Sequence, residues 1–216
     1  MLAGCDATRA NMASPSGVNF NGRDPVFETP AQWQFIVRCV KAKHMLTVMM
    51  ECRDQEPELA HTLSALVTGA VEGLVSDVVI LDHGSRDGSS RVADAAGCRF
   101  YAQWNIDDVM RSVRGEWILL VEPGARPQTG WIEDILEYVS INKSPARFSP
   151  SRHYKRSLFS RIARRQPPLE YGYLMPKKHA MSVAKPGMSL SQLVHAQKPR
   201  RLTAELIPSW VLSAAR

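Results

Sequence analysis

A short apolar strand that runs directly into an acidic turn is the feature that most constrains the fold of this chain. Residues Val78–Leu81 form an uninterrupted apolar run, which is typical of a strand buried on both faces. The apolar run ends at Asp82. The chain then enters the turn His83–Ser89, which contains two glycines. Open α/β sheets bind ligands at the carboxyl ends of their strands, so Asp82 marks a candidate site as well as a strand end.

Strand and helix patterns alternate along residues 46–140. The predicted strands are Leu46–Met50, Val78–Leu81, Arg99–Ala102 and Trp117–Val121. The predicted helices are Pro57–Gly69, Ser89–Ala96, Ile106–Arg114 and Trp131–Ser140. This order predicts an α/β fold in which a mostly parallel sheet with right-handed crossovers is flanked by helices.

The length of 216 residues favours one domain with three parts. Residues 1–44 are rich in Asn, Ser, Pro and Gly, which predicts a disordered extension, although Ala31–Lys43 has the spacing of a short amphipathic helix. Residues 45–142 form the predicted core. Met45 opens this patterned region, and we hypothesise that it is the biological start. Residues 143–216 are predicted to form a basic, helical C-terminal extension of the same domain that faces the acceptor or a membrane.

The charge is distributed very unevenly. Residues 1–142 carry 12 basic and 19 acidic side chains, whereas residues 143–216 carry 15 basic and two acidic ones. Residues 152–165 read as a basic amphipathic helix, which Pro167 ends. The apolar face of that helix either lies on an anionic membrane surface or packs on the sheet, and the sequence leaves both open. No nucleic-acid-binding motif accompanies the charge.

Four cysteines show no spacing typical of a metal site or a disulfide framework. Free thiols in a reducing cytoplasm are therefore the favoured interpretation. No apolar run reaches the ~20 residues that a membrane-spanning helix needs. The sequence predicts a cytoplasmic protein, with peripheral attachment to the inner face of the membrane as an option.

Three motifs in order resemble the small bacterial members of glycosyltransferase family 2, which have the GT-A fold. Residues 53–59 are similar to the family's acidic opening loop, and Leu81–Ser89 is close to its Asp-Asp-Gly-Ser-x-Asp-Gly-Thr motif. The stretch Arg114–Ala125, followed by Gly130-Trp131, is similar to the family's Arg-Gly-Glu-Trp strand and the Asp-x-Asp position after it. The resemblance extends from Leu46 to Tyr138 and more weakly to Ser209.

The resemblance implies that Asp82 and Asp54 bind the nucleoside of a nucleotide-diphospho sugar, with uridine as the expected nucleoside. A carboxylate accepts hydrogen bonds from a uracil N–H or from sugar hydroxyls. The alternative role for Asp82 is to cap the turn at Gly84. His83 stands where the family often has a carboxylate, and it either contacts phosphate or is an ordinary loop residue. Asp87 is expected to cap the following helix.

The Asp-x-Asp position reads Glu122-Pro123-Gly124. The resemblance implies a divalent cation here, Mg²⁺ or Mn²⁺, with Glu122 as its candidate ligand. Gly124 supplies no side-chain ligand, so the motif is eroded and the metal site incomplete. The basic residues of the C-terminal part could neutralise the diphosphate instead, and transfer would then need no metal.

Inverting members of the family use a late carboxylate as the base. Between Glu170 and Glu205 this chain has no acidic residue. Glu170 and Glu205 are the remaining candidate bases, although neither stands at the family's position. Glu170 is the favoured one, and its alternative role is to pair with nearby arginines.

The sequence thus predicts transfer of a sugar from a nucleotide-diphospho donor, expected to be a UDP-sugar, to a hydroxyl on a glycan or lipid carrier. Two alternatives stay open. One is a non-catalytic GT-A-like protein that binds nucleotide sugars, and the other is a basic scaffold at a membrane surface.

Overall fold

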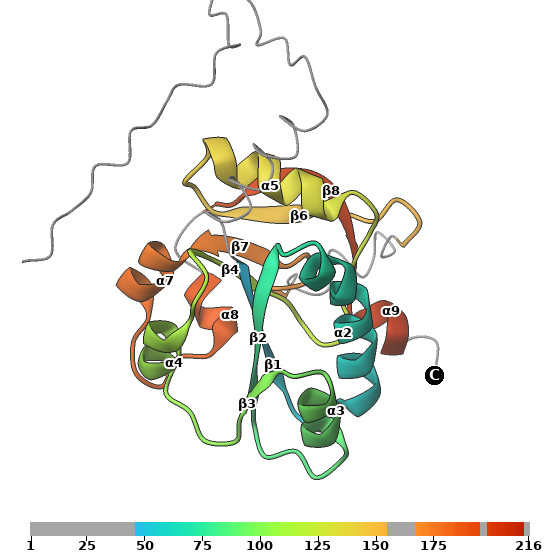
Figure 1. Cartoon of the computed structure of the whole chain (residues 1–216), viewed down its shortest axis with the longest axis vertical. Helices are drawn as coiled ribbons and strands as arrows, with labels where there is room; N and C mark the ends of the chain where they lie inside the picture. The colour runs from blue at the N-terminus through green and yellow to red at the C-terminus, as the bar shows by residue number, and fades with distance from the viewer. Residues whose placement is uncertain (1–45, 155–166, 195–197, 214–216) are drawn as a thin grey trace, which may run out of the picture. The chain divides into compact units, whose positions relative to one another are not determined.

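The computed structural model describes residues 46–154, 167–194 and 198–213. All of these residues belong to one unit, Cys39–Arg216. An eight-stranded sheet with the strand order β3-β2-β1-β4-β7-β6-β8-β5 forms its centre (Figure 1).

The strands of the first half are β1 (Leu46–Cys52), β2 (Val75–Asp82), β3 (Arg99–Tyr101) and β4 (Trp117–Leu120), all mutually parallel. The helices between them are α2 (Glu56–Val71), α3 (Ser89–Ala95) and α4 (Ile106–Ser112), and α5 (Trp131–Ile141) follows β4. Each predicted strand and helix of residues 46–140 is present, with ends that differ by a few residues. The sequence predicted this half of the sheet because each of its strands and helices buries a continuous apolar surface, which local apolar spacing reveals.

The second half of the sheet is mixed and was not predicted. Its strands are β5 (Arg126–Pro127), β6 (Ala146–Pro150), β7 (Tyr173–Pro176) and β8 (Arg200–Ile207). Strand β7 runs antiparallel to β4 and β6, whereas β6 and β8 are parallel. Residues after 142 therefore complete the sheet, and short helices α7 (Lys177–Val183), α8 (Leu190–Leu193) and α9 (Trp210–Ser213) accompany them.

Two apolar layers cover the two faces of the sheet. One contains side chains from α2, α3 and α5, among them Leu59, Leu66 and Trp131. The other contains side chains from α4, α7 and α8, such as Val109 and Leu190. Figure 1 shows α2 and α3 on one side of β1 and β2 and α4, α7 and α8 on the other.

A close approach joins α2 to α5. A Cβ atom added at Gly69 would lie 2.6 Å from the ring of Trp131, which is 3% exposed. The glycine lets the buried indole lie directly against the helix backbone. This contact fixes the last turns of α2 against the start of α5.

Two predictions lie outside the described residues. The extension of residues 1–44 is wholly outside them, and so is nearly all of the basic helix predicted for residues 152–165. Within the described part of the chain, no helix is both long enough and apolar enough to cross a membrane.

Candidate functional site

Carboxyl ends of neighbouring strands bring the predicted site residues to one edge of the sheet. Cys52 at the end of β1 pairs with Asp82 at the end of β2, and Met49 of β1 pairs with Leu120 of β4. The start of β7 lies at the same edge, because Tyr173 pairs with Leu120 in antiparallel register. The loops that follow β1, β2 and β4 and precede β7 therefore meet there.

Asp82 is buried, 5% exposed, and both of its carboxylate oxygens serve the turn after β2. Oδ2 accepts from the backbone N–H of Gly84 at 3.0 Å and of Ser85 at 3.0 Å. Oδ1 accepts from the Ser85 hydroxyl and, at 3.5 Å, from the Cys52 thiol. The carboxylate thus caps the turn, and little of it remains for a ligand.

These contacts determine the protonation of both partners. Burial raises the pKa of Asp82, but hydrogen bonds from Ser85, Cys52 and Gly84 outweigh it and hold the pKa below its usual value. Burial, followed by the charge of Asp82, raises the pKa of the Cys52 thiol to about 12. At neutral pH Asp82 is therefore an anion and Cys52 a neutral thiol.

Asp54 ties the loop after β1 to the loop after β2. Its backbone N–H donates to the Ser85 hydroxyl at 2.9 Å, and its Oδ1 accepts from the Arg86 N–H at 2.7 Å. Asp54 has φ = 51°, a left-handed conformation that aspartate and asparagine tolerate best among non-glycine residues. The side chain is exposed, and Oδ2 accepts no hydrogen bond from the described residues.

A second, reciprocal pair of hydrogen bonds connects the same two loops. Glu56 accepts from the Gly88 N–H at 2.9 Å, and Asp87 accepts from the Glu56 N–H at 2.9 Å. Asp87 also accepts from the N–H of Ser89, the first residue of α3, although Gly88 and not Asp87 is the N-cap residue of that helix. A Cβ atom at Gly88 would lie 2.4 Å from the Glu56 carboxylate, so glycine is required for this contact. The two loops therefore form one cross-linked unit, named here the tied loops (residues 53–56 and 83–89).

His83 lies against the other face of the sheet, beside a carboxylate that the sequence analysis did not single out. Its Nε2 lies 3.5 Å from Oε2 of Glu51, and its ring meets the indole of Trp104 edge-on at a centroid distance of 5.3 Å. Glu51 also accepts from the Leu190 N–H at 2.6 Å, and the Trp104 indole N–H donates to the Asp82 carbonyl at 3.1 Å. The histidine side chain is 44% exposed and that of Glu51 is 22% exposed.

Glu122 follows β4, and the segment before α9 covers its position. The Ser209 hydroxyl donates to the Glu122 carboxylate. Gly124 has φ = +95°, and a Cβ atom there would lie 3.3 Å from the Ser209 backbone. Its N–H donates to the Thr62 hydroxyl at 2.8 Å. A side chain at position 124 would thus meet both backbone strain and a close neighbour.

Glu170 is buried, 2% exposed, just before β7. One of its oxygens accepts from the Trp210 indole N–H at 2.9 Å. The adjacent residues Ser209 and Trp210 therefore contact the two predicted carboxylates, Glu122 and Glu170, and bring them to one place. Buried and hydrogen-bonded in this way, Glu170 has poor access to a substrate hydroxyl.

The donor set at this edge does not suit a divalent cation. Among the described residues, no group of three or more His, Cys, Asp or Glu side chains could hold a metal ion. Glu122 is hydrogen-bonded to Ser209, and Gly124 offers no ligand atom. Hard cations need several oxygen ligands, and the residues present do not supply them.

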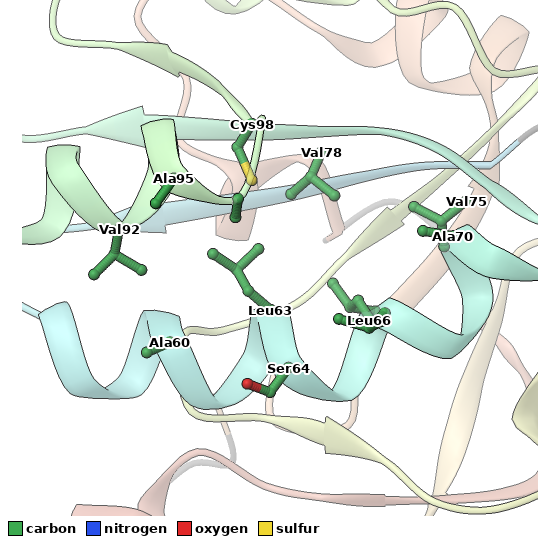
Figure 2. Close-up of a pocket in the computed structure, with 12 residues that line it drawn as sticks. Ala60, Leu63, Ser64, Leu66, Ala70, Val75, Val78, Val92, Ala95 and Cys98 are labelled. Atoms are coloured by element: carbon green, nitrogen blue, oxygen red, sulfur yellow. The ribbon is translucent and has the colours of Figure 1, made fainter.

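An apolar cavity of about 420 Å³ lies elsewhere, between α2 and α3 (Figure 2). It is lined by residues such as Leu63, Val78 and Cys98, with Ser64 as its hydroxyl-bearing member. It borders the first half of β2, whereas the candidate site follows the end of that strand. The cavity lacks convergent polar groups and is therefore a packing gap rather than a nucleotide site.

The sequence analysis missed several residues of the edge. Glu51 carried a signal, since it is the one charged residue of β1. Trp104, Ser209 and Trp210 carried none, because their contacts span long sequence separations.

Comparisons with known proteins define the fold. No family model and no curated protein matches the chain. Solved structures do match, among them glucosyl-3-phosphoglycerate synthase from Mycobacterium tuberculosis in complex with phosphoglyceric acid (15% identity, TM-score 0.52, 68% of this chain and 62% of that one). The same enzyme with Mn²⁺, UDP and glucosyl-3-phosphoglycerate matches at 14% identity and TM-score 0.54 over 88% of this chain and 82% of that one.

A further structure, described only as a mycobacterial protein, matches at 17% identity and TM-score 0.51, over 68% of this chain and 58% of that one. The chain thus spans about three-fifths of the length of the phosphoglyceric acid complex and of the mycobacterial protein. These likenesses show the fold: the chain has the GT-A-like, Rossmann-type architecture that the sequence predicted.

Proposed function

We propose that this chain is a glycosyltransferase that moves a sugar from a nucleotide-diphospho donor, specifically a UDP-sugar, to a hydroxyl acceptor. The observation that carries the proposal is the pair of tied loops at the carboxyl edge of a GT-A-like sheet. Such an edge is where open α/β sheets bind nucleotides. The similar solved enzyme has been captured with UDP and with UDP-glucose, which supports a donor of this class.

In this proposal Asp54 makes the direct contact with the nucleoside. Asp54 is an exposed residue whose Oδ2 accepts no hydrogen bond from the described residues, whereas both oxygens of Asp82 accept hydrogen bonds from Ser85. Asp54 Oδ2 would accept from a ribose hydroxyl or from the uracil N–H. Asp82 supports that contact indirectly, because it holds Ser85, to which Asp54 is bonded.

The proposed reaction needs no metal ion at Glu122 and Gly124, because these two residues do not form a site that would bind one. Basic side chains of residues 143–216 would neutralise the departing diphosphate instead. Mn²⁺ accompanies UDP in the similar enzyme, so the difference is testable. Turnover that persists in excess EDTA supports the proposal, and strict dependence on Mn²⁺ or Mg²⁺ would overturn this part of it.

The acceptor proposed here is a hydroxyl on a glycan or lipid carrier, and the proposed location is the cytoplasm. A lipid-linked acceptor would bring the basic segment of residues 152–165 to an anionic membrane surface. Flotation with liposomes tests this idea: recovery with anionic but not with neutral liposomes supports it, and no recovery with either argues for a water-soluble acceptor.

A second candidate is a non-catalytic protein that binds nucleotide sugars. It is favoured by the hydrogen bonds of Glu122 with Ser209 and of Glu170 with Trp210, which engage the candidate metal ligand and the candidate base. Thermal-shift screening with UDP-sugars separates the two candidates, because a ligand that binds the native state raises its melting temperature. Binding followed by donor cleavage identifies the enzyme, and binding without cleavage identifies the second candidate. A melting temperature that no UDP-sugar changes would contradict both.

A further inference from the structure

We infer that His83 and Glu51 form the proton-accepting pair of this site, with His83 as the general base and Glu51 as the residue that positions it. The inference rests on the proposed function, since it supplies the base for the proposed transfer. Three observations support it: the contact between the two side chains, their place at the sheet edge, and the removal of Glu170 from consideration.

The contact has the geometry of an oriented base. Oε2 of Glu51 lies 3.5 Å from Nε2 of His83, and Oε1 of Glu51 is held by the Leu190 N–H at 2.6 Å. A carboxylate at Nε2 favours the tautomer that carries its proton there and leaves a lone pair on Nδ1. The edge-on contact with Trp104 restricts the ring further. Glu51 and Trp104 thus contact the imidazole from two sides, and in this proposal Nδ1 is its proton acceptor.

The pair also lies at the edge of the sheet where β1 and β2 end. Met49 pairs with Leu120 in β1 and β4, and Glu51 and Glu122 each lie two residues beyond that pair. Strand β1 thus places Glu51 at the same edge of the sheet as the loop that follows β4. His83 is 44% exposed, which allows an acceptor hydroxyl to reach it. Glu170, by contrast, is 2% exposed and bonded to Trp210.

The chemical step balances without a further reactant. The acceptor O–H gives its proton to Nδ1 of His83 while its oxygen bonds to the anomeric carbon. The bond between that carbon and the diphosphate oxygen breaks, and the electron pair leaves with UDP. With water as the acceptor, the products are the free sugar and UDP. Glu51 stabilises the imidazolium that forms, and the proton then passes to solvent.

The test measures UDP release from UDP-glucose with water as the acceptor, together with UDP binding. His83→Ala should keep its affinity for UDP and lose kcat by about 10²-fold or more. Added imidazole should restore part of the lost rate, which a merely structural role would not allow. His83→Gln provides a second variant with a similar volume, and His61→Ala, an exposed histidine on α2, is the matched control that should keep wild-type kcat.

Glu51→Gln tests the positioning role, because glutamine can still accept from the Leu190 N–H but carries no charge. It should lower kcat by about tenfold or more at unchanged UDP affinity. It should also abolish the preference for the Nε2–H tautomer, which ¹⁵N NMR of the His83 ring detects directly.

The possible failures can be told apart. If the wild-type chain binds neither UDP nor UDP-glucose, the proposed function falls and the pair falls with it. If the wild type binds and cleaves the donor while both His83 variants cleave it equally fast, the pair alone is wrong. Binding without cleavage by the wild type overturns the pair and leaves the non-catalytic binding protein.

Discussion

Aspartates at the site edge divide between structure and recognition. Both carboxylate oxygens of Asp82 and of Asp87 accept hydrogen bonds, whereas Oδ2 of Asp54 accepts none from the described residues. The sequence predicted that Asp82 and Asp54 would come together, and they do so through Ser85. The sequence could not predict which of the two carboxylates accepts its hydrogen bonds within the turn, because that depends on the direction of each backbone N–H.

Replacement of Asp82 should affect stability, and in a pH-dependent manner. The pKa of Asp82 is lower in the folded chain than its usual value of 3.8, so its contribution is complete above the unfolded pKa and is lost as the pH falls through the folded one. Asp82→Asn should cost about 1–3 kcal/mol at pH 7, because an amide N–H would face a backbone N–H. Urea denaturation at pH 7 and at pH 3 measures this. A difference between wild type and variant that is the same at both pH values would contradict the assignment.

Cys52 and Cys98 should be unreactive thiols in the native chain. Burial and the charge of Asp82 raise the pKa of Cys52 to about 12, and burial and the charge of Asp77 raise the pKa of Cys98 to about 11. Because the thiolate is the reactive form, both cysteines should remain unmodified when the native chain is treated with an alkylating reagent at pH 8. Mass spectrometry measures the modification. Labelling in urea, where both should react, is the control. Fast native labelling of Cys52 would refute its burial against Asp82.

At the scale of elements, the loops and the last helix form the site. The predicted strands and helices of residues 46–140 follow from local apolar spacing. Strand β8 also carried a local signal, because Leu202, Ala204 and Leu206 alternate with more exposed residues. That signal was masked by the arginines at its start, and β6 contains a proline and an arginine. Pairing of β6, β7 and β8 connects residues far apart in sequence, which local patterns cannot reveal.

Restoring the eroded motif should fail for a structural reason. Gly124 has φ = +95°, and a Cβ atom there would lie 3.3 Å from the Ser209 backbone. Gly124→Asp should therefore lose about 1–3 kcal/mol of stability rather than gain a metal site. Gly124→Ala is the matched control and should lose a similar amount, since the Cβ atom causes the strain. Chemical denaturation with and without Mn²⁺ measures both effects. A Gly124→Asp variant that Mn²⁺ stabilises strongly would contradict this account.

At the scale of the whole molecule, the acidic and the basic parts of the sequence contribute different strands to one sheet. Residues up to 142 supply the parallel strands and the tied loops, and the basic remainder supplies β6, β7, β8 and the segment over Glu122 and Glu170. The sequence predicted a core within residues 45–142 and a basic helical extension after it, whereas three strands of the sheet come from the residues after 142. It did not predict that Ser209 and Trp210 would engage both carboxylates.

The central claim is that a nucleoside docks on the tied loops through Asp54, and calorimetric titration with UDP tests it most directly. Asp54→Asn keeps the left-handed backbone and the acceptor for Arg86, and removes only the charge and the exposed oxygen. Asp108→Asn, an exposed aspartate on α4, is the matched control. Wild type and Asp108→Asn should bind UDP alike. Asp54→Asn should bind about tenfold more weakly or worse at unchanged melting temperature. Equal binding by all three proteins, or no binding by the wild type, would contradict the claim.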